Sequence, residues 1–156
     1  MVSIAIPGFC TLRLAHLVLD FNGTLAARGK LLAGVRPRVA RLRRQLRIHV
    51  VTADTFGKAA DELGAIDCKL QILPQRGQSR AKAAYVRELG ASRTACIGNG
   101  RNDRQMLRVA ALGIATVQQE GAAAAALLAA DVVVLDIRDA LDLLLQPKRL
   151  VATLRS

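Results

Sequence analysis

Aromatic residues are scarce in this sequence. Its 156 residues include no tryptophan, one tyrosine and three phenylalanines, so aromatic residues make up 3% of the chain. Lysine and arginine outnumber aspartate and glutamate by 23 to 12, and the net charge of +11 suits an anionic partner such as a phosphorylated metabolite. Proteins that bind single-stranded nucleic acid stack its bases on aromatic side chains. The composition therefore argues against a nucleic-acid-binding module, for which charge is the only support.

Disulfide, membrane and linker features are lacking as well. Cys10, Cys68 and Cys96 are odd in number and widely spaced, which argues against a disulfide framework or a zinc site. No apolar run is long enough to cross a bilayer, and the N-terminus has no basic signal-peptide start. No Gly/Ser-rich or Pro-rich segment interrupts the chain. We therefore expect a soluble, cytoplasmic protein in which residues 1–156 form a single domain.

Arginine is densest between Arg36 and Arg47, where six arginines occur. Four apolar residues recur among them at helical spacing. They are Val35, Val39, Leu42 and Leu46. We interpret this segment as an amphipathic helix with a buried apolar stripe and a solvated basic face.

Short runs of Val, Ile, Leu and Ala alternate with amphipathic helical patterns. This alternation is typical of a parallel sheet covered on both faces, so the predicted fold is α/β, a Rossmann-like doubly wound sheet. The expected strands are 16–21, 48–52, 69–73, 94–97, 113–116 and 131–135. The expected helices are 35–46, 57–63, 79–89, 102–110, 122–129 and 139–145, with a last short helix after Pro147. Segments 3–6 and 10–14 flank Pro7-Gly8, which predicts an N-terminal hairpin added at a sheet edge.

Four segments place polar residues where predicted strands end or where the next helix begins. The first strand leads into Asp20-Phe21-Asn22-Gly23-Thr24, the second into Thr52-Ala53-Asp54, and the fourth into Gly98-Asn99-Gly100-Arg101-Asn102-Asp103. Lys82 lies near the start of the helix after the third strand. Parallel strands bring their carboxyl ends to one sheet edge, where ligands bind. A carboxylate such as Asp20 at the end of an apolar strand must be paired, metal-bound or functional.

Some of these residues also have ordinary structural interpretations. Thr52 and Asp54 suit a helix cap, and a lysine such as Lys82 taken alone suits the surface. The loop at 98–103 is harder to explain as a turn, because its asparagine and aspartate side chains offer oxygen ligands for a hard cation.

Together, the four segments resemble the four motifs of the haloacid dehalogenase superfamily of phosphotransferases, in the right order and at the right strand ends. Within that superfamily they are most similar to the phosphorylation domain of P-type ATPases, whose motifs are DKTGTL, TGD and GDGxND. The resemblance spans about Leu17 to Asp136. It implies a stand-alone Mg²⁺-dependent phosphohydrolase, with no transmembrane helices to make it a pump.

The resemblance also implies a role for each matching residue. Asp20 would be the nucleophile, and the catalytic set would be Asp20, Asn22, Thr52 and Lys82. The phosphate would be bound by Thr52, Ala53, Lys82 and Asn102. The Mg²⁺ ligands would be Asp20, the backbone carbonyl of Asn22, Asn99 and Asp103. Positioning and charge stabilisation of this kind are what phosphoryl transfer requires.

Two residues depart from the family pattern. Asn22 stands where most phosphatases of the superfamily carry a second aspartate, the general acid and base. We therefore expect slow turnover and a preference for activated substrates such as acyl phosphates, nucleotide anhydrides or aryl phosphates. Asn99 stands where an aspartate is usual, so Mg²⁺ should bind more weakly. Because both changes remove a carboxylate, a non-catalytic phosphate-binding or regulatory protein is the alternative.

No segment is long enough to form the cap domain that usually closes such a site. The two places where caps are inserted correspond here to residues 26–34 and 74–78. A capless site would accept a phosphorylated small molecule or a phosphate carried on a macromolecule, or would borrow a lid from a neighbouring subunit of a homo-oligomer. The segment at 26–32 predicts a hairpin whose tip, Arg28-Gly29-Lys30, is either a substrate contact or a solvated turn.

Overall fold

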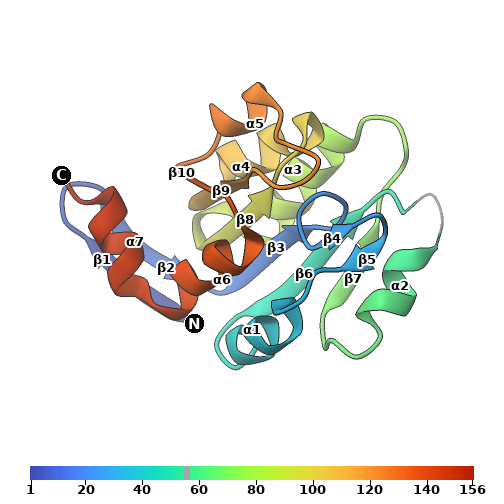
Figure 1. Ribbon diagram of the computed structural model, residues 1–156. Helices are drawn as coiled ribbons and strands as arrows, with labels where there is room; N and C mark the ends of the chain where they lie inside the picture. The colour runs from blue at the N-terminus through green and yellow to red at the C-terminus, as the bar shows by residue number, and fades with distance from the viewer. Residues whose placement is uncertain (55–56) are drawn as a thin grey trace.

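A computed structural model describes residues 1–54 and 57–156. Its centre is a six-stranded sheet in the order β10-β9-β8-β3-β6-β7, and every pairing within it is parallel (Figure 1). Counted along the chain, these strands run 3-2-1-4-5-6 across the sheet, which is the doubly wound order. The predicted α/β, Rossmann-like fold is confirmed. The strands are β3 (His16–Asp20), β6 (Arg47–Thr52), β7 (Lys69–Ile72), β8 (Thr94–Gly98), β9 (Leu112–Thr116) and β10 (Val132–Val134).

Helices cover both faces of this sheet (Figure 1). Leu17 and Leu19 of β3 belong to the larger hydrophobic core, which lies between the sheet and helices α1 and α6. Val18 belongs to a smaller core on the other face, between the sheet and helices α3 and α4. Successive strand residues face opposite sides of a sheet, so a continuous apolar run such as Leu17-Val18-Leu19 is what burial on both faces requires. The helices are α1 (Val35–Leu42), α2 (Lys58–Leu63), α3 (Gln78–Leu89), α4 (Arg104–Val109), α5 (Ala124–Leu127), α6 (Ile137–Leu145) and α7 (Pro147–Leu154), with 3₁₀ turns η1 (Ala91–Arg93) and η2 (Arg101–Asp103).

The bounds of three helices differ most from the expected ones. The helix expected at 35–46 becomes irregular after Leu42, although all four residues of its predicted apolar stripe are buried. The helix expected at 102–110 begins as η2, because the amide of Asp103 donates to the carbonyl of Gly100 in a tighter turn. The helix expected at 122–129 is shortened to Ala124–Leu127.

The N-terminal hairpin forms as expected, but its expected place at a sheet edge is wrong. Within the described residues, β1 (Val2–Ile6) and β2 (Cys10–Leu14) pair only with each other, while β7 and β10 form the edges of the main sheet. Only Ala15 separates β2 from the central strand, whose two sides are already occupied by β6 and β8. The hairpin therefore continues from the amino end of β3, where α7 packs against β1 (Figure 1).

The two places where a cap domain could be inserted are short. Between β3 and α1 the chain forms only the small hairpin β4 (Ala26–Ala27) and β5 (Lys30–Leu31), which confirms the hairpin expected there. Residues 73–77 connect β7 to α3. No helix in the described part of the chain is long and apolar enough to cross a membrane.

Candidate active site

A cavity of about 310 Å³ opens at the carboxyl ends of β3, β6 and β8. In a doubly wound sheet this is the point where the strand order reverses and a crevice forms. Six of the predicted site residues line it, namely Asp20, Asn22, Thr52, Ala53, Asn99 and Asn102. The other two, Lys82 and Asp103, are buried beside it. Lys82 forms ion pairs with both Asp20 and Asp103. The fold therefore brings all eight predicted residues to one place.

Lys82 is a buried cation and not a surface lysine. It belongs to α3, is 1% exposed, and its Nζ donates to Oδ1 of Asp20 and to Oδ1 of Asp103, each over 2.6 Å. These two carboxylates raise the pKa of Lys82 against the opposing effect of burial, so the ammonium stays protonated. A buried charge is tolerated only when it is paired in this way. Lys82 therefore fixes the position of the Asp20 carboxylate and supplies positive charge beside it.

Burial makes Asp20 harder to ionise than an ordinary aspartate. Burial, followed by the nearby Asp103 carboxylate, raises the pKa of Asp20 to about 6, and Lys82 and a hydrogen bond from Thr24 oppose this rise. The carboxyl group is therefore largely ionised at neutral pH and available as a nucleophile. Below pH 6 its protonated form dominates.

Asp103 holds the loop between β8 and α4 in shape. Its Oδ2 accepts the backbone amides of Asn99 and Gly100 over 3.0 and 2.8 Å, and its Oδ1 accepts Lys82. Both carboxylate oxygens are thus engaged, and the side chain is fully buried. Its predicted role as an Mg²⁺ ligand stays a prediction.

The backbone at Gly98 passes close against Asp103. A Cβ atom added at Gly98 would lie 2.6 Å from both Cγ and Oδ2 of Asp103, closer than real contacts allow. We expect Gly98→Ala to destabilise the protein by about 1–3 kcal/mol, as overpacking does, and to lower activity by displacing the loop. Urea unfolding would measure the change. Gly64→Ala is the control, because a Cβ there meets only ordinary contacts at 3.5 Å, and an equal loss in both variants would contradict the prediction.

Thr24 and Gln118 belong to the site, although sequence reasoning assigned them no role. The fully buried hydroxyl of Thr24 donates to Oδ2 of Asp20 over 3.1 Å and lies 3.3 Å from Oδ1 of Asn99. The amide of Gln118, after β9, donates to the backbone carbonyls of Gly23 and Thr24 over 3.2 and 2.8 Å. The loops that follow β3, β8 and β9 are therefore held together around Asp20.

Glu120 is the third residue that the sequence reasoning missed. Its carboxylate lines the cavity, and a Cβ atom added at Gly23 would lie 2.6 Å from Oε2 of Glu120 and 2.5 Å from Nδ2 of Asn99. Glycine is therefore needed at position 23 for two reasons: its φ of 78° lies in the left-handed region, and a side chain there would collide with Asn99 and Glu120. The position of Glu120, just after a strand of the same sheet, is the signal that could have found it.

Asp54 and Asn102 have clear local partners. Oδ1 of Asp54 accepts the amide of Ala59 in the first turn of α2 over 3.3 Å, which supports the capping interpretation of Asp54. The Oγ1 of Thr52 accepts the amide of Asp54 over 3.1 Å. Among the described residues the hydroxyl proton of Thr52 has no acceptor, so it can be donated to a ligand. The side-chain amide of Asn102 donates to Gln78 at the start of α3 over 2.7 Å and so anchors the loop.

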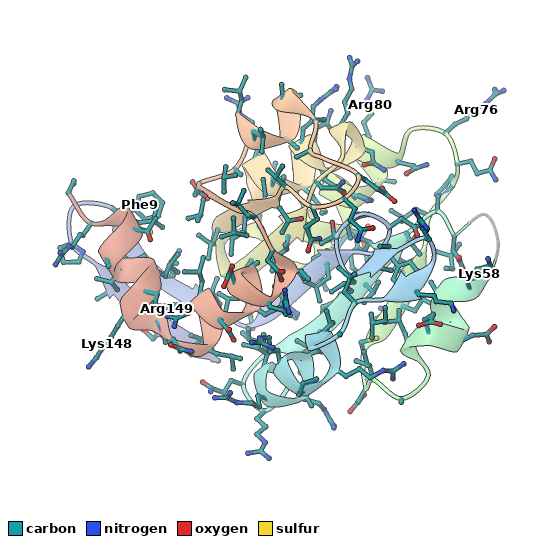
Figure 2. All side chains as sticks on the ribbon, viewed as in Figure 1. Phe9, Lys58, Arg76, Arg80, Lys148 and Arg149 are labelled. Atoms are coloured by element: carbon teal, nitrogen blue, oxygen red, sulfur yellow. The ribbon has the colours of Figure 1, made fainter. Side chains whose placement is uncertain are left out.

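Three exposed cations lie on segments next to those that line the cavity. Arg76 and Arg80 flank Gln78, which lines it, and Lys58 touches the tip of the β4–β5 hairpin at Gly29. Figure 2 shows all three side chains projecting from the surface. None of the three forms an ion pair with another described residue.

This architecture is also found in solved structures of hydrolases of the haloacid dehalogenase (HAD) superfamily, which share 16–19% identity with this chain. Its structural neighbours include a cobalt-bound deoxy-D-mannose-octulosonate 8-phosphate phosphatase from Haemophilus influenzae, with a TM-score of 0.72 and 15% identity over 92% of this chain and 94% of that one. The corresponding phosphatase from Moraxella catarrhalis, in complex with magnesium, phosphate and KDO, gives 0.72 and 15% over 90% and 92%. A zinc-transporting PIB-type ATPase in its E2.Pi state gives 0.61 and 24% over 80% of this chain and 20% of that one.

The similarity of this sequence to known sequences is limited. No family model matches the chain. A segment of 59 residues is 54% identical to an uncharacterised protein of Methanocaldococcus jannaschii. The match covers 38% of this chain and 63% of that protein, so the chain spans less than two thirds of the relative.

Proposed function

We propose that the protein is a Mg²⁺-dependent phosphohydrolase that works through a phosphorylated Asp20. The observation that carries this proposal is the carboxylate at the end of the central strand, held between the buried ammonium of Lys82 at 2.6 Å and the hydroxyl of Thr24 at 3.1 Å. The fold, which it shares with phosphatases that bind phosphate and metal, supports the same chemistry.

Two displacements at phosphorus would complete the reaction. The Asp20 carboxylate attacks phosphorus, the bond to the leaving group breaks, and the leaving group departs with the electron pair. Water then attacks the aspartyl phosphate, which releases inorganic phosphate and restores Asp20. The free hydroxyl proton of Thr52, the backbone of Ala53 and the ammonium of Lys82 would stabilise the charge on the phosphoryl oxygens.

The donors that face the cavity suit Mg²⁺. Asp20, the backbone carbonyl of Asn22 and Oδ1 of Asn99 are hard oxygen donors, and Mg²⁺ is usually held by one or two carboxylates together with water and substrate phosphate. The described residues contain no group of three or more His, Cys, Asp or Glu side chains suited to a metal, so the ion would depend on amide and carbonyl oxygens. When bound, Mg²⁺ would neutralise charge on the phosphoryl group. Asp103 would support this set through Lys82 and the loop.

Mg²⁺ affinity should depend on pH through Asp20. A ligand must lose its proton to bind a metal, and burial raises the pKa of Asp20 to about 6. Above that pH the carboxylate is already ionised and the affinity should be constant, whereas below it the dissociation constant should rise about tenfold per pH unit. Calorimetric titration with MgCl₂ between pH 5 and pH 8 would measure this. A flat profile would contradict the assignment of Asp20 as a ligand.

The substrate would be a phosphorylated small molecule with a good leaving group. Asn22 lines the cavity where most superfamily phosphatases place a general acid, and an amide cannot protonate a departing alkoxide. A second cavity of about 350 Å³, lined by Gly23, Leu32, Leu135 and Glu120 among others, adjoins the first and could receive the leaving group. Acyl phosphates and phosphoric anhydrides are the substrates we expect, and part of a zinc-transporting ATPase shares this fold.

The test is to trap the phosphorylated enzyme. Incubation with MgCl₂ and acetyl phosphate, ATP or an aryl phosphate should release phosphate and leave an acid-stable, hydroxylamine-labile phosphoenzyme. Asp20→Asn should abolish both signals, and Asp61→Asn, an exposed aspartate in α2, is the matched control. Equal signals in the Asp20 variant and the wild type would refute the proposal.

A non-catalytic phosphate-binding or regulatory protein is the second candidate. Asn22 and Asn99 favour it, because two fewer carboxylates reduce repulsion against a dianionic phosphate. Saturable, Mg²⁺-dependent binding of phosphate without any phosphoenzyme or turnover would support this function instead.

A further inference from the structure

A chain of three polar side chains is buried at the opposite end of the sheet from the nucleophile. His16 is the first residue of β3, His49 lies in β6 and Tyr85 in α3, and all three are less than a tenth exposed. Nδ1 of His16 lies 3.1 Å from Nε2 of His49, and Nδ1 of His49 lies 2.8 Å from the hydroxyl of Tyr85. Three hydrogen-bonding side chains are thus buried on the sheet face of the smaller core, at the amino ends of its strands.

The surroundings of this chain are strongly basic. Burial first, then the nearby cations, lower the pKa of both histidines: Arg93 and Arg47 act on His16, while His16, Lys69 and Arg47 act on His49, whose pKa falls to about 4. Both imidazoles are therefore neutral at physiological pH.

A cavity of about 430 Å³ adjoins the histidines at the amino ends of β3, β6 and β7. We call it the lower cavity, lined by His16, Arg43, Leu46, Arg47, Ile48, His49, Asp67, Cys68, Lys69 and Leu89. Its one carboxylate, Asp67, is paired with Arg43. Arg47 and Lys69 form no ion pair with another described residue, and Nζ of Lys69 lies 5.7 Å from the ring centre of Tyr85.

The hydrogen-bond chain can present a donor to this cavity. When Tyr85 donates to Nδ1 of His49, Nε2–H of His49 donates to Nδ1 of His16. The Nε2–H of His16 is then left free, and it forms no hydrogen bond to another described side chain. A neutral imidazole that donates in this way, beside two unpaired cations, is the donor set that an oxyanion requires.

We propose that the lower cavity binds a small multivalent oxyanion of the phosphate type between Arg47, Lys69 and His16. This site is separate from the catalytic one and does not depend on the proposed reaction. The cavity has room for a phosphate ion with its water. Arg47 and Lys69 are exposed, so the affinity should fall as the salt concentration rises.

The chain contains two histidines, and both lie at this site, so its imidazole NMR signals report on the lower cavity alone. We would titrate the full chain with potassium phosphate, and separately with potassium chloride at matched ionic strength. Phosphate should shift both imidazole signals saturably and raise the pKa of the histidines, because a nearby anion favours their charged form. The amides of Asn99 and Gly100 report separately on phosphate in the catalytic cavity.

Charge removal provides the matched comparison. Arg47→Ala combined with Lys69→Ala should weaken the binding seen at the imidazoles by at least about tenfold, because two charged contacts are lost. Arg41→Ala combined with Arg44→Ala removes the same charge from exposed positions and should change nothing. If the first pair lowers the unfolding midpoint, Arg47→Gln with Lys69→Gln replaces it. The proposal is overturned if chloride shifts the signals equally, if phosphate leaves them unmoved, or if both variant pairs bind alike.

Discussion

Lys82→Met should inactivate the protein and destabilise it. The substitution keeps the length of the side chain but removes the ammonium from between two buried carboxylates that it contacts at 2.6 Å each. Removing one partner from a buried ion pair costs about 3–5 kcal/mol, because the remaining charges stay buried and unpaired. The loss of positive charge beside the transferred phosphoryl group should lower kcat by about 10²–10³-fold.

The pH dependence distinguishes this cause from simple packing. Without Lys82, the Asp20 carboxyl should take up a proton at higher pH than in the wild type, since Lys82 is the main group that lowers its pKa. The folded variant should therefore regain stability as the pH falls, because protonation removes the unpaired charge. Urea unfolding at pH 5 and pH 8 would measure this. Lys58→Met is the exposed control, and adding Asp103→Asn should return part of the lost stability. A destabilisation of equal size at both pH values would show that packing, and not charge, is responsible.

Asn22→Asp should increase the turnover of substrates with poor leaving groups by about 10²–10⁴-fold, the usual contribution of general acid–base catalysis. Asn22 is exposed within the cavity, so a carboxylate can be accommodated there without burying a new charge. An alkyl phosphate needs a proton on its departing oxygen and should gain most. Acetyl phosphate needs none, so its rate of enzyme phosphorylation should hardly change.

Single-turnover rates with an alkyl phosphate and with acetyl phosphate would test this difference. The phosphoenzyme should also decay faster in the variant, since the new carboxylate can take a proton from the attacking water. Asn22→Ala is the control: it keeps the backbone carbonyl but adds no acid. An equal gain with both substrates would mean that the aspartate acts in some other way, for example through Mg²⁺ affinity.

Local patterns in the sequence were sufficient for much of the fold and for the placement of the site. The apolar run of β3 and the alternation of strand and helix patterns predicted a parallel sheet, and the rule that carboxyl ends of parallel strands converge brought Asp20, Thr52 and Asn99 together. The burial of Lys82 did not follow from its own surroundings in the sequence. It depends on how α3 packs across the sheet, 62 residues away from Asp20 along the chain.

Other features could not be predicted because they depend on packing between distant segments. The N-terminal hairpin was recognised from its own pattern, but its position follows from the single-residue link at Ala15 and from the full pairing of β3. Gln118 holds the loop after β3 by hydrogen bonds to backbone carbonyls. Every residue has a backbone carbonyl, so residue types in the sequence cannot reveal such bonds. The contact between His16 and His49 is likewise a matter of register between two strands.

Helix α3 touches both ends of the sheet. Its first residue, Gln78, accepts a hydrogen bond from the loop after β8, and Lys82 donates one to Asp20. Tyr85 is hydrogen-bonded to His49, and Leu89 lines the lower cavity. A shift of this 12-residue helix along its axis moves both of its ends together. A ligand that moves α3 at one cavity must therefore alter affinity at the other, and thermodynamic reciprocity requires the two ligands to change each other's dissociation constants by the same factor.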